Sequence, residues 1–271
     1  MINIIIGKNS NLSNKLSEKL NDFVLISARE ILYDKTILKK YMQDEINLIF
    51  NNFQSSNLLN DVLSTNEYIS NTILATSIVL DYFKNTKINK IIYTSSSSVY
   101  GNNILCNEKD ELKPMNLHSS LKISNEKMIE KYCMQKNIDY TIARIFNMYG
   151  GNDKFSIISK IIKGYKDKKN ITIINNGNAI RDFIHIDDVV EVYIKLLELK
   201  NIKILNVGTG EGNSIQGILK FLSNNKIKIN TTNVFQNELK ISTADNQLLI
   251  ANINKSKFIK VENYLKQELS L

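Results

Sequence analysis

The feature that most constrains the fold is an alternation, along most of the chain, of short β-branched apolar runs with longer amphipathic stretches. The short runs predict strands at residues 2–6, 23–27, 47–51, 90–95, 140–146, 171–174 and 204–207. The longer stretches predict helices at residues 13–20, 66–83, 118–135, 157–165 and 187–199. Such alternation is typical of βαβ units, which build a parallel sheet covered by helices. We therefore predict an α/β fold, with a doubly wound parallel sheet in residues 1–150. Residues 151–271 are expected to form a smaller lobe, with some segments returning to the first domain.

The composition excludes several classes of protein. The chain has 271 residues, of which 43% are hydrophobic and 23% charged, with one proline and ten glycines, so it is neither collagen-like nor a Pro-rich linker. Its net charge of +8 comes from scattered lysines, whereas a nucleic-acid-binding protein gathers its basic residues into one stripe. Cys106 and Cys133 fit a reducing compartment, and no apolar run approaches the roughly 18 residues of a membrane span. We expect a cytoplasmic protein that binds neither nucleic acid nor membrane.

The first predicted strand is followed by a turn of small and polar residues, Gly7, Ser10, Asn11, Leu12 and Ser13, in the spacing G-x-x-S-x-x-S. A dinucleotide-binding turn needs small residues here, because the backbone and the helix N-terminus must approach the pyrophosphate. We interpret these five residues as a cofactor-binding turn. The alternative is a plain strand-to-helix turn in which a serine caps the helix.

The second predicted strand is followed by Arg29, and the nearest carboxylate is Glu30. In dinucleotide-binding sheets an acidic residue at this place binds the ribose 2′-hydroxyl of NAD, whereas an arginine accommodates the 2′-phosphate of NADP. We therefore predict NADP as the cofactor, with NAD as the alternative. An exposed arginine that merely opens a helix is the other interpretation.

Five collinear segments resemble the extended short-chain dehydrogenases/reductases, the family of nucleotide-sugar epimerases, dehydratases and reductases. They are Tyr93-Thr-Ser-Ser-Ser-Ser-Val-Tyr-Gly101, Lys122 with Glu126 after Pro114, Arg144-Ile-Phe-Asn147-Met-Tyr-Gly150, Arg181-Asp-Phe-Ile-His185-Ile-Asp-Asp188 and Asn206-Val-Gly-Thr-Gly210. The resemblance covers about residues 1–215 and implies a Rossmann-like fold. It also implies a homodimer that pairs the helices predicted at 66–83 and 118–135.

The resemblance implies a role for each matching residue. Ser96 binds the keto or hydroxyl oxygen of the substrate, and Lys122 holds the nicotinamide ribose and lowers the pKa of the proton donor. Ser97, Asn147 and Arg181 bind the nucleotide sugar, with Arg181 on its diphosphate, because a guanidinium forks onto phosphate oxygens. No metal site is expected. Without the resemblance, other interpretations hold for these residues. The serine run is then a polar turn, Lys122 is a solvated lysine, and His185 forms hydrogen bonds at the start of a helix.

The sequence departs from the family at the proton donor, a tyrosine four residues before the lysine, where this chain has His118. Residues i and i+4 share a helix face, so His118 is expected beside Lys122. A histidine suits general acid–base work, although a neighbouring lysine cation lowers its pKa and leaves a neutral imidazole, which is a poor acid. Either His118 replaces the tyrosine, with Ser96 or a nearby tyrosine sharing the task, or the site has lost its donor.

We predict an enzyme that uses NADPH to reduce a nucleotide-linked 4-keto-6-deoxy sugar for surface polysaccharide synthesis. Arg29 favours this hypothesis, as does a chain length closer to the family's 4-keto reductases, and Ser95-Ser96-Ser97 stands where its dehydratases have an acidic signature. One alternative is a nucleotide-sugar epimerase with retained NAD. The other is a catalytically decayed homologue that only binds nucleotides.

Overall fold

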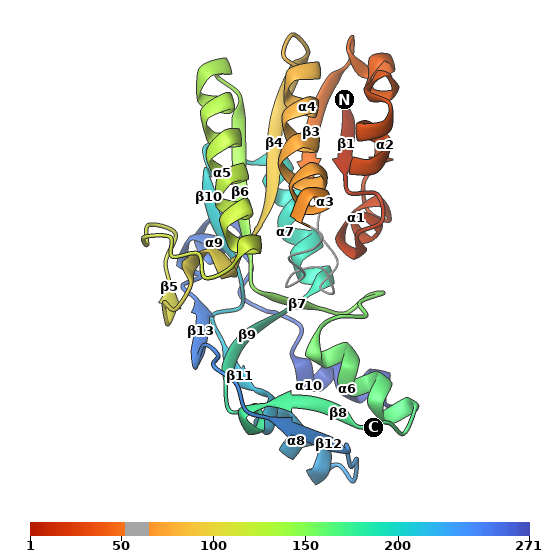
Figure 1. Ribbon diagram of the computed structural model, residues 1–271, viewed down its shortest axis with the longest axis vertical. Helices are drawn as coiled ribbons and strands as arrows, with labels where there is room; N and C mark the ends of the chain where they lie inside the picture. Colours follow the sequence, from red (N-terminus) through yellow and green to blue (C-terminus); the bar gives the residue numbers. More distant parts are fainter. Residues whose placement is uncertain (52–64) are drawn as a thin grey trace. The chain divides into compact units, whose positions relative to one another are not determined.

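The computed structural model describes residues 1–51 and 65–271 (Figure 1). The described chain divides into two compact units. Unit 1 comprises Met1–Val99, Leu112–Arg144 and Val190–Leu205, and unit 2 comprises Tyr100–Glu111, Ile145–Val189 and Asn206–Leu271. The units therefore interleave along the sequence.

The principal sheet has six strands in the order β10-β6-β4-β3-β1-β2. β1 pairs in parallel with β2 and with β3, and β3 pairs in parallel with β4. The predicted α/β fold with a large parallel sheet is confirmed. The strands are β1 (Ile2–Ile6), β2 (Phe23–Ile26), β3 (Glu45–Phe50), β4 (Lys87–Ser96), β6 (Asp139–Ile145) and β10 (Ile204–Val207).

Three of the helices that accompany this sheet begin at side-chain caps. Ser10 caps α1 (Asn11–Ser17), Ser27 and Glu30 form a capping box on α2 (Ala28–Tyr33), and Asn116 caps α5. The helix predicted at 66–83 is divided by a π-helical turn. The helical elements of this part of the chain that follow α2 are a 3-10 helix (Lys35–Tyr41), α3 (Thr65–Ile69), the π turn η4 (Ser70–Leu74), α4 (Ala75–Tyr82), α5 (Leu117–Lys136) and α7 (Ile186–Glu198).

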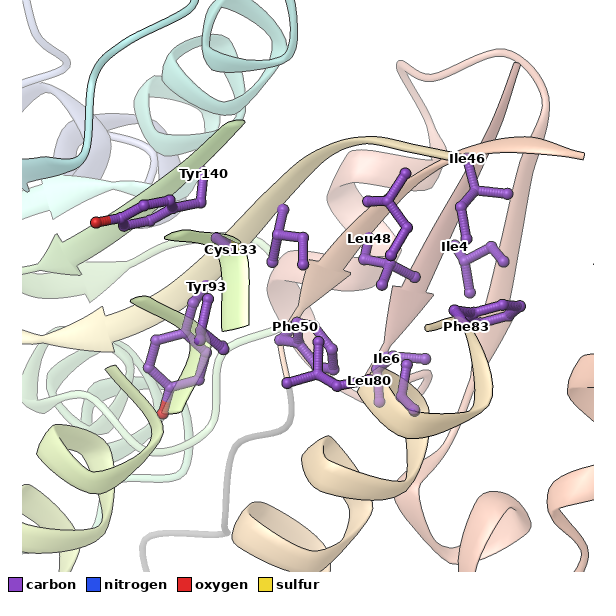
Figure 2. Packing of buried hydrophobic residues seen from close by; sticks show 14 of the residues in the cluster. Ile4, Ile6, Ile46, Leu48, Phe50, Leu80, Phe83, Tyr93, Cys133 and Tyr140 are labelled. Carbon is purple, nitrogen blue, oxygen red and sulfur yellow. The ribbon is translucent and has the colours of Figure 1, made fainter. Parts of the chain in front are cut away.

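One hydrophobic core of unit 1 lies between the sheet and the layer of α4 and α5. The hydroxyl of Tyr132 on α5 donates to the carbonyl of Leu80 on α4 at 3.0 Å, so the two helices pack side by side. Each fully buried Leu, Ile or Phe contributes roughly 1.5–3 kcal/mol by its removal from water. The packed side chains include Ile4, Ile6, Ile46, Leu48, Phe50, Leu80, Phe83, Tyr93, Cys133 and Tyr140 (Figure 2).

Unit 2 has its own sheet, in the order β11-β9-β13-β5, with β7 pairing beside β9, and a two-stranded sheet of β12 and β8. A separate core includes Tyr149, Ile161, Phe183 and Leu265. Within the described ranges, no helix is long and apolar enough to cross a membrane. The elements are β5 (Leu105–Cys106), β7 (Asn147–Tyr149), α6 (Ile157–Lys166), β8 (Ile171–Ile174), β9 (Ile180–His185), β11 (Gly212–Ser214), α8 (Ile215–Asn224), β12 (Thr231–Val234), β13 (Ile241–Ala244), α9 (Gln247–Ile253) and α10 (Val261–Glu268).

Candidate active site

The turn after β1 combines a strained glycine with a pair of mutually bonded serines. Gly7 has φ +115°, a conformation that residues with a side chain rarely adopt. Ser10 Oγ accepts from the Ser13 N–H at 3.0 Å, and its hydroxyl donates to Ser13 Oγ at 2.8 Å. Asn11 opens α1, and the Leu12 side chain is fully buried, so Leu12 offers a ligand only its backbone. Ser10 is thus the N-cap of α1, as in the alternative considered from the sequence, and Ser13 is its hydrogen-bond partner.

A chain of buried hydrogen bonds links this turn to the ends of two further strands. Asn51, directly after β3, donates from Nδ2 to Ser13 Oγ at 3.2 Å. Thr94 on β4 donates to Asn51 Oδ1, and its hydroxyl lies 2.6 Å from the Tyr193 hydroxyl. Sequence reasoning missed Asn51 and Thr94, although a polar residue closing a wholly apolar strand is a visible signal in the case of Asn51.

Arg29 lies in the first turn of α2, and its side chain is 78% exposed. Its Nη2 donates to Glu67 Oε1 at 2.6 Å. Glu30 is committed to the capping box, and the Ser27 N–H that it accepts holds the pKa of its carboxyl below the usual range. A 2′-phosphate at Arg29 therefore has to compete with the carboxylate of Glu67.

The serines at the end of β4 have different surroundings. Ser95 is buried and donates to the Glu126 carboxylate, which also accepts from Arg144 Nη2 at 2.7 Å and Nε at 3.2 Å. Ser96 is the last residue of β4, and its Oγ accepts from the Ser98 N–H at 3.2 Å. Ser95 is thus a structural residue, whereas Ser96 and the following Ser97 are half-buried at the strand end.

Lys122 is a buried cation inside unit 1. Its Nζ donates to the Thr94 carbonyl at 2.7 Å and lies 5.0 Å from the centre of the Tyr93 ring. Burial lowers the pKa of Lys122 to about 7, against the opposing attraction of Glu126. The solvated lysine considered from the sequence is therefore not what the structure shows, because Lys122 is held among buried groups where its charge is costly.

His118 lies in the first turn of α5, among side chains that include Lys122, Tyr93 and Asn125. Its Nδ1 forms a short hydrogen bond with the hydroxyl of Tyr68 from α3. Burial, reinforced by the nearby charge of Lys122, lowers the pKa of His118 to about 4, so the imidazole is neutral at pH 7. No local pattern in the sequence indicates that Tyr68 reaches this place.

In unit 2, the pairing of β7 with β9 brings Asn147 opposite Phe183, and Asn147 Nδ2 donates to the Asp182 carbonyl at 3.1 Å. Arg181 donates to Glu238 Oε2 at 3.2 Å and to its neighbour's carbonyl, that of Ile180, at 2.9 Å. Asn147 and Arg181 thus lie on adjacent strands. Arg181, like Arg29, is already paired with a glutamate.

Two other residues of the unit 2 motifs are structural. The buried Asp182 accepts N–H groups from Thr209, Gly210 and Ala244, which fixes the glycine loop after β10. His185 packs its ring against Tyr149, and its Nδ1 accepts from the Asp187 N–H at 3.2 Å. This is the helix-entry role considered for His185.

The sequence model of the NAD dependent epimerase/dehydratase family matches residues 8–208. The chain belongs to this family. The expected resemblance to the extended short-chain dehydrogenases/reductases is thereby confirmed.

Curated relatives in the epimerase/dehydratase family include Protein CapI of Staphylococcus aureus, 27% identical over 205 residues that cover 67% of this chain and 60% of the relative. The dTDP-D-glucose 4,6-dehydratase of Dictyostelium discoideum is 27% identical over 194 residues, covering 66% of this chain and 45% of the relative. The chain thus spans about half the length of these two relatives.

Solved structures of the same fold include MoeE5 in complex with UDP-glucose and NAD, with a TM-score of 0.90 at 17% identity, covering 100% of this chain and 98% of the other. The UDP-glucuronic acid 4-epimerase of Bacillus cereus, in complex with UDP-glucuronic acid and NAD, has a TM-score of 0.85 at 22% identity. That match covers 100% of this chain and 98% of the other.

Proposed function

We propose that this family member transfers hydride between a nicotinamide dinucleotide and a sugar linked to a nucleoside diphosphate. The observation that carries the proposal is the pair His118 and Lys122, one turn apart on α5, with Lys122 Nζ bonded to the Thr94 carbonyl near the end of β4. A proton donor and a cation placed together can stabilise and protonate an oxyanion as hydride is delivered. Structural relatives in complex with NAD and UDP-sugars support the same reaction class.

The residues of unit 1 fit a nicotinamide dinucleotide. Gly7, at positive φ, lets the chain turn so that the N-terminus of α1, formed by Ser10, Asn11, Leu12 and Ser13, would hold the pyrophosphate. Lys122 is proposed to exchange the Thr94 carbonyl for the nicotinamide ribose. When bound, the nicotinamide supplies or accepts the hydride.

The substrate roles follow the same proposal. Ser96 donates its hydroxyl to the reacting oxygen of the sugar, and His118 delivers the proton. Ser97 and Asn147 bind the sugar nucleotide, and Arg181 leaves Glu238 to fork onto the diphosphate.

In its finer form, the reaction is reduction of a 4-keto-6-deoxy sugar by NADPH for surface polysaccharide synthesis. The exposed guanidinium of Arg29 supports NADPH, because it lies at the surface and can exchange Glu67 for a 2′-phosphate. The enzyme is proposed to be a cytoplasmic homodimer that pairs α4 and α5 with their symmetry mates. Exposed apolar side chains near these helices, such as Leu74 and Met134, support the dimer, and the sedimentation coefficient tests it.

A second candidate is a nucleotide-sugar epimerase that retains NAD. The Arg29–Glu67 ion pair favours it, because a carboxylate beside the β2 end suits the ribose 2′-hydroxyl of NAD and repels a 2′-phosphate. An epimerase returns its hydride to the same sugar, so it turns over without net oxidation of the dinucleotide.

The test is turnover of NADPH, followed by nicotinamide absorbance, with a nucleotide-linked 4-keto-6-deoxy sugar. His118→Ala removes the donor at the reacting oxygen, and general acid catalysis contributes about 10²–10⁴-fold, so we expect kcat to fall by about that factor. The matched control is Ser124→Ala on the exposed side of the same helix, whose hydroxyl donates only to the Ser120 carbonyl. Unchanged rates with His118→Ala contradict its role, and sugar interconversion without consumption of NADPH selects the epimerase.

A further inference from the structure

Tyr68 and His118 come from two different helices and meet at the reacting end of the site. Tyr68 lies on α3, is only 3% exposed, and reaches across to His118 on α5 with an edge-on ring contact at 6.2 Å and 74°. Its carbonyl accepts from the Thr72 hydroxyl at 2.7 Å in the π turn that follows. π-helical turns are frequent at functional sites, where they redirect side chains.

The surroundings of His118 explain why it needs a partner. The imidazole lies in the positive first turn of α5, faces the cation of Lys122 and is largely buried, and all three disfavour its protonated form. A neutral imidazole carries one N–H and one lone pair. It can pass a proton on only if a second donor refills the nitrogen that carries the lone pair.

We infer that Tyr68 and His118 form a two-residue proton relay, in which the Tyr68 hydroxyl donates to Nδ1 and the Nε2–H of His118 donates to the sugar oxygen. This inference rests on the proposed function. As the carbonyl carbon takes the hydride, its oxygen takes the Nε2 proton, Nδ1 takes the phenol proton, and Tyr68 regains a proton from water. Position 118 has no tyrosine of its own. In the relay, Tyr68 on α3 supplies the phenol proton instead, and the imidazole of His118 passes it on.

The tautomer of His118 tests the relay without any cofactor. The chain has two histidines, so ¹⁵N-histidine labelling gives a spectrum with His118 and a built-in reference, His185. In the intact protein we expect the Nε2–H tautomer at His118. Tyr68→Phe removes only the hydroxyl and should shift the His118 nitrogen signals toward the other tautomer while those of His185 stay fixed. Unchanged His118 signals overturn the relay.

A double-mutant cycle tests the same inference in turnover. Tyr68→Phe should lower kcat by about 10²-fold, the lower end for general acid catalysis, with little change in KM. His118→Tyr places a phenol directly at the substrate, so adding Tyr68→Phe to that variant should cost nothing further. Equal losses in both backgrounds overturn the relay, because Tyr68 then acts independently of His118.

The matched control is Tyr132→Phe, which deletes another partly buried hydroxyl of unit 1, the one that donates to the Leu80 carbonyl. It should leave kcat and the His118 signals unchanged, and an equal effect on either overturns the specific role of Tyr68. The proposed function fails on a different result, which is absence of hydride transfer in the unaltered protein. The histidine spectrum still decides the relay in that case.

Discussion

At the scale of single residues, the site of unit 1 is built around a buried cation whose burial is unfavourable. Lys122 is 4% exposed, and its Nζ donates to the backbone carbonyl of Thr94. Burial of a charged group lowers the stability of the fold, and such groups cluster at functional sites. The buried Lys122 therefore indicates a functional site.

The unfavourable burial of the Lys122 charge predicts how the free energy of unfolding depends on pH. The pKa of Lys122 is about 7 in the fold against 10.5 ordinarily, so the unfolded chain binds more protons between these values. The free energy of unfolding should therefore rise with pH across this window, by up to about 1.4 kcal/mol per pH unit from this group. Urea unfolding of Lys122→Met at several pH values should show a smaller rise of the unfolding free energy with pH. The control is Lys84→Met, which replaces an exposed lysine. An identical pH slope in Lys122→Met contradicts the burial of a charge.

At the scale of elements, sequence periodicity predicted those whose apolar residues pack locally. The strands at 171–174 and 204–207 match β8 and β10, and the helix at 118–135 is α5 to within a residue at each end. α2 was considered only as an alternative at Arg29, although Ser27 and Glu30 carry the capping-box spacing that is typical of a helix start. The short strands β9, β11 and β13 were missed, because pairing with distant partners, not local pattern, makes them strands.

The buried ion pair between α5 and β6 gives a prediction for these elements. Glu126 and Arg144 are both at most 3% exposed, and Glu126→Gln leaves the guanidinium without its countercharge. Breaking a buried pair from one side costs about 3–5 kcal/mol, so we expect that loss in the free energy of unfolding. The control is Glu130→Gln on the same helix, whose partner Lys127 is exposed, with an expected change within about 0.5 kcal/mol. Equal losses for the two variants contradict the assignment.

At the scale of the whole molecule, the family and the parallel-sheet fold were predictable because five short motifs keep their order along the chain. Residues 190–205 lie in unit 1 and residues 100–111 in unit 2, and local sequence patterns do not say which segments interleave in this way, because tertiary contacts decide it. Within the site, helical spacing predicted that His118 and Lys122 share a face. Tyr68, Glu67 and Glu238 were invisible from sequence because each reaches its partner from a distant segment.

The central claim, that this molecule is a dinucleotide-dependent enzyme of nucleotide sugars, is tested most directly by calorimetric titration of the cofactor-free protein with NADPH and, separately, NADH. We expect saturable binding with NADPH preferred. Glu67→Gln should strengthen that preference by releasing Arg29, whereas Glu45→Gln, an equally exposed glutamate paired with Lys87, should not. A preference for NADH selects the epimerase. Binding of neither dinucleotide contradicts the account and leaves a nucleotide-sugar scaffold without hydride chemistry.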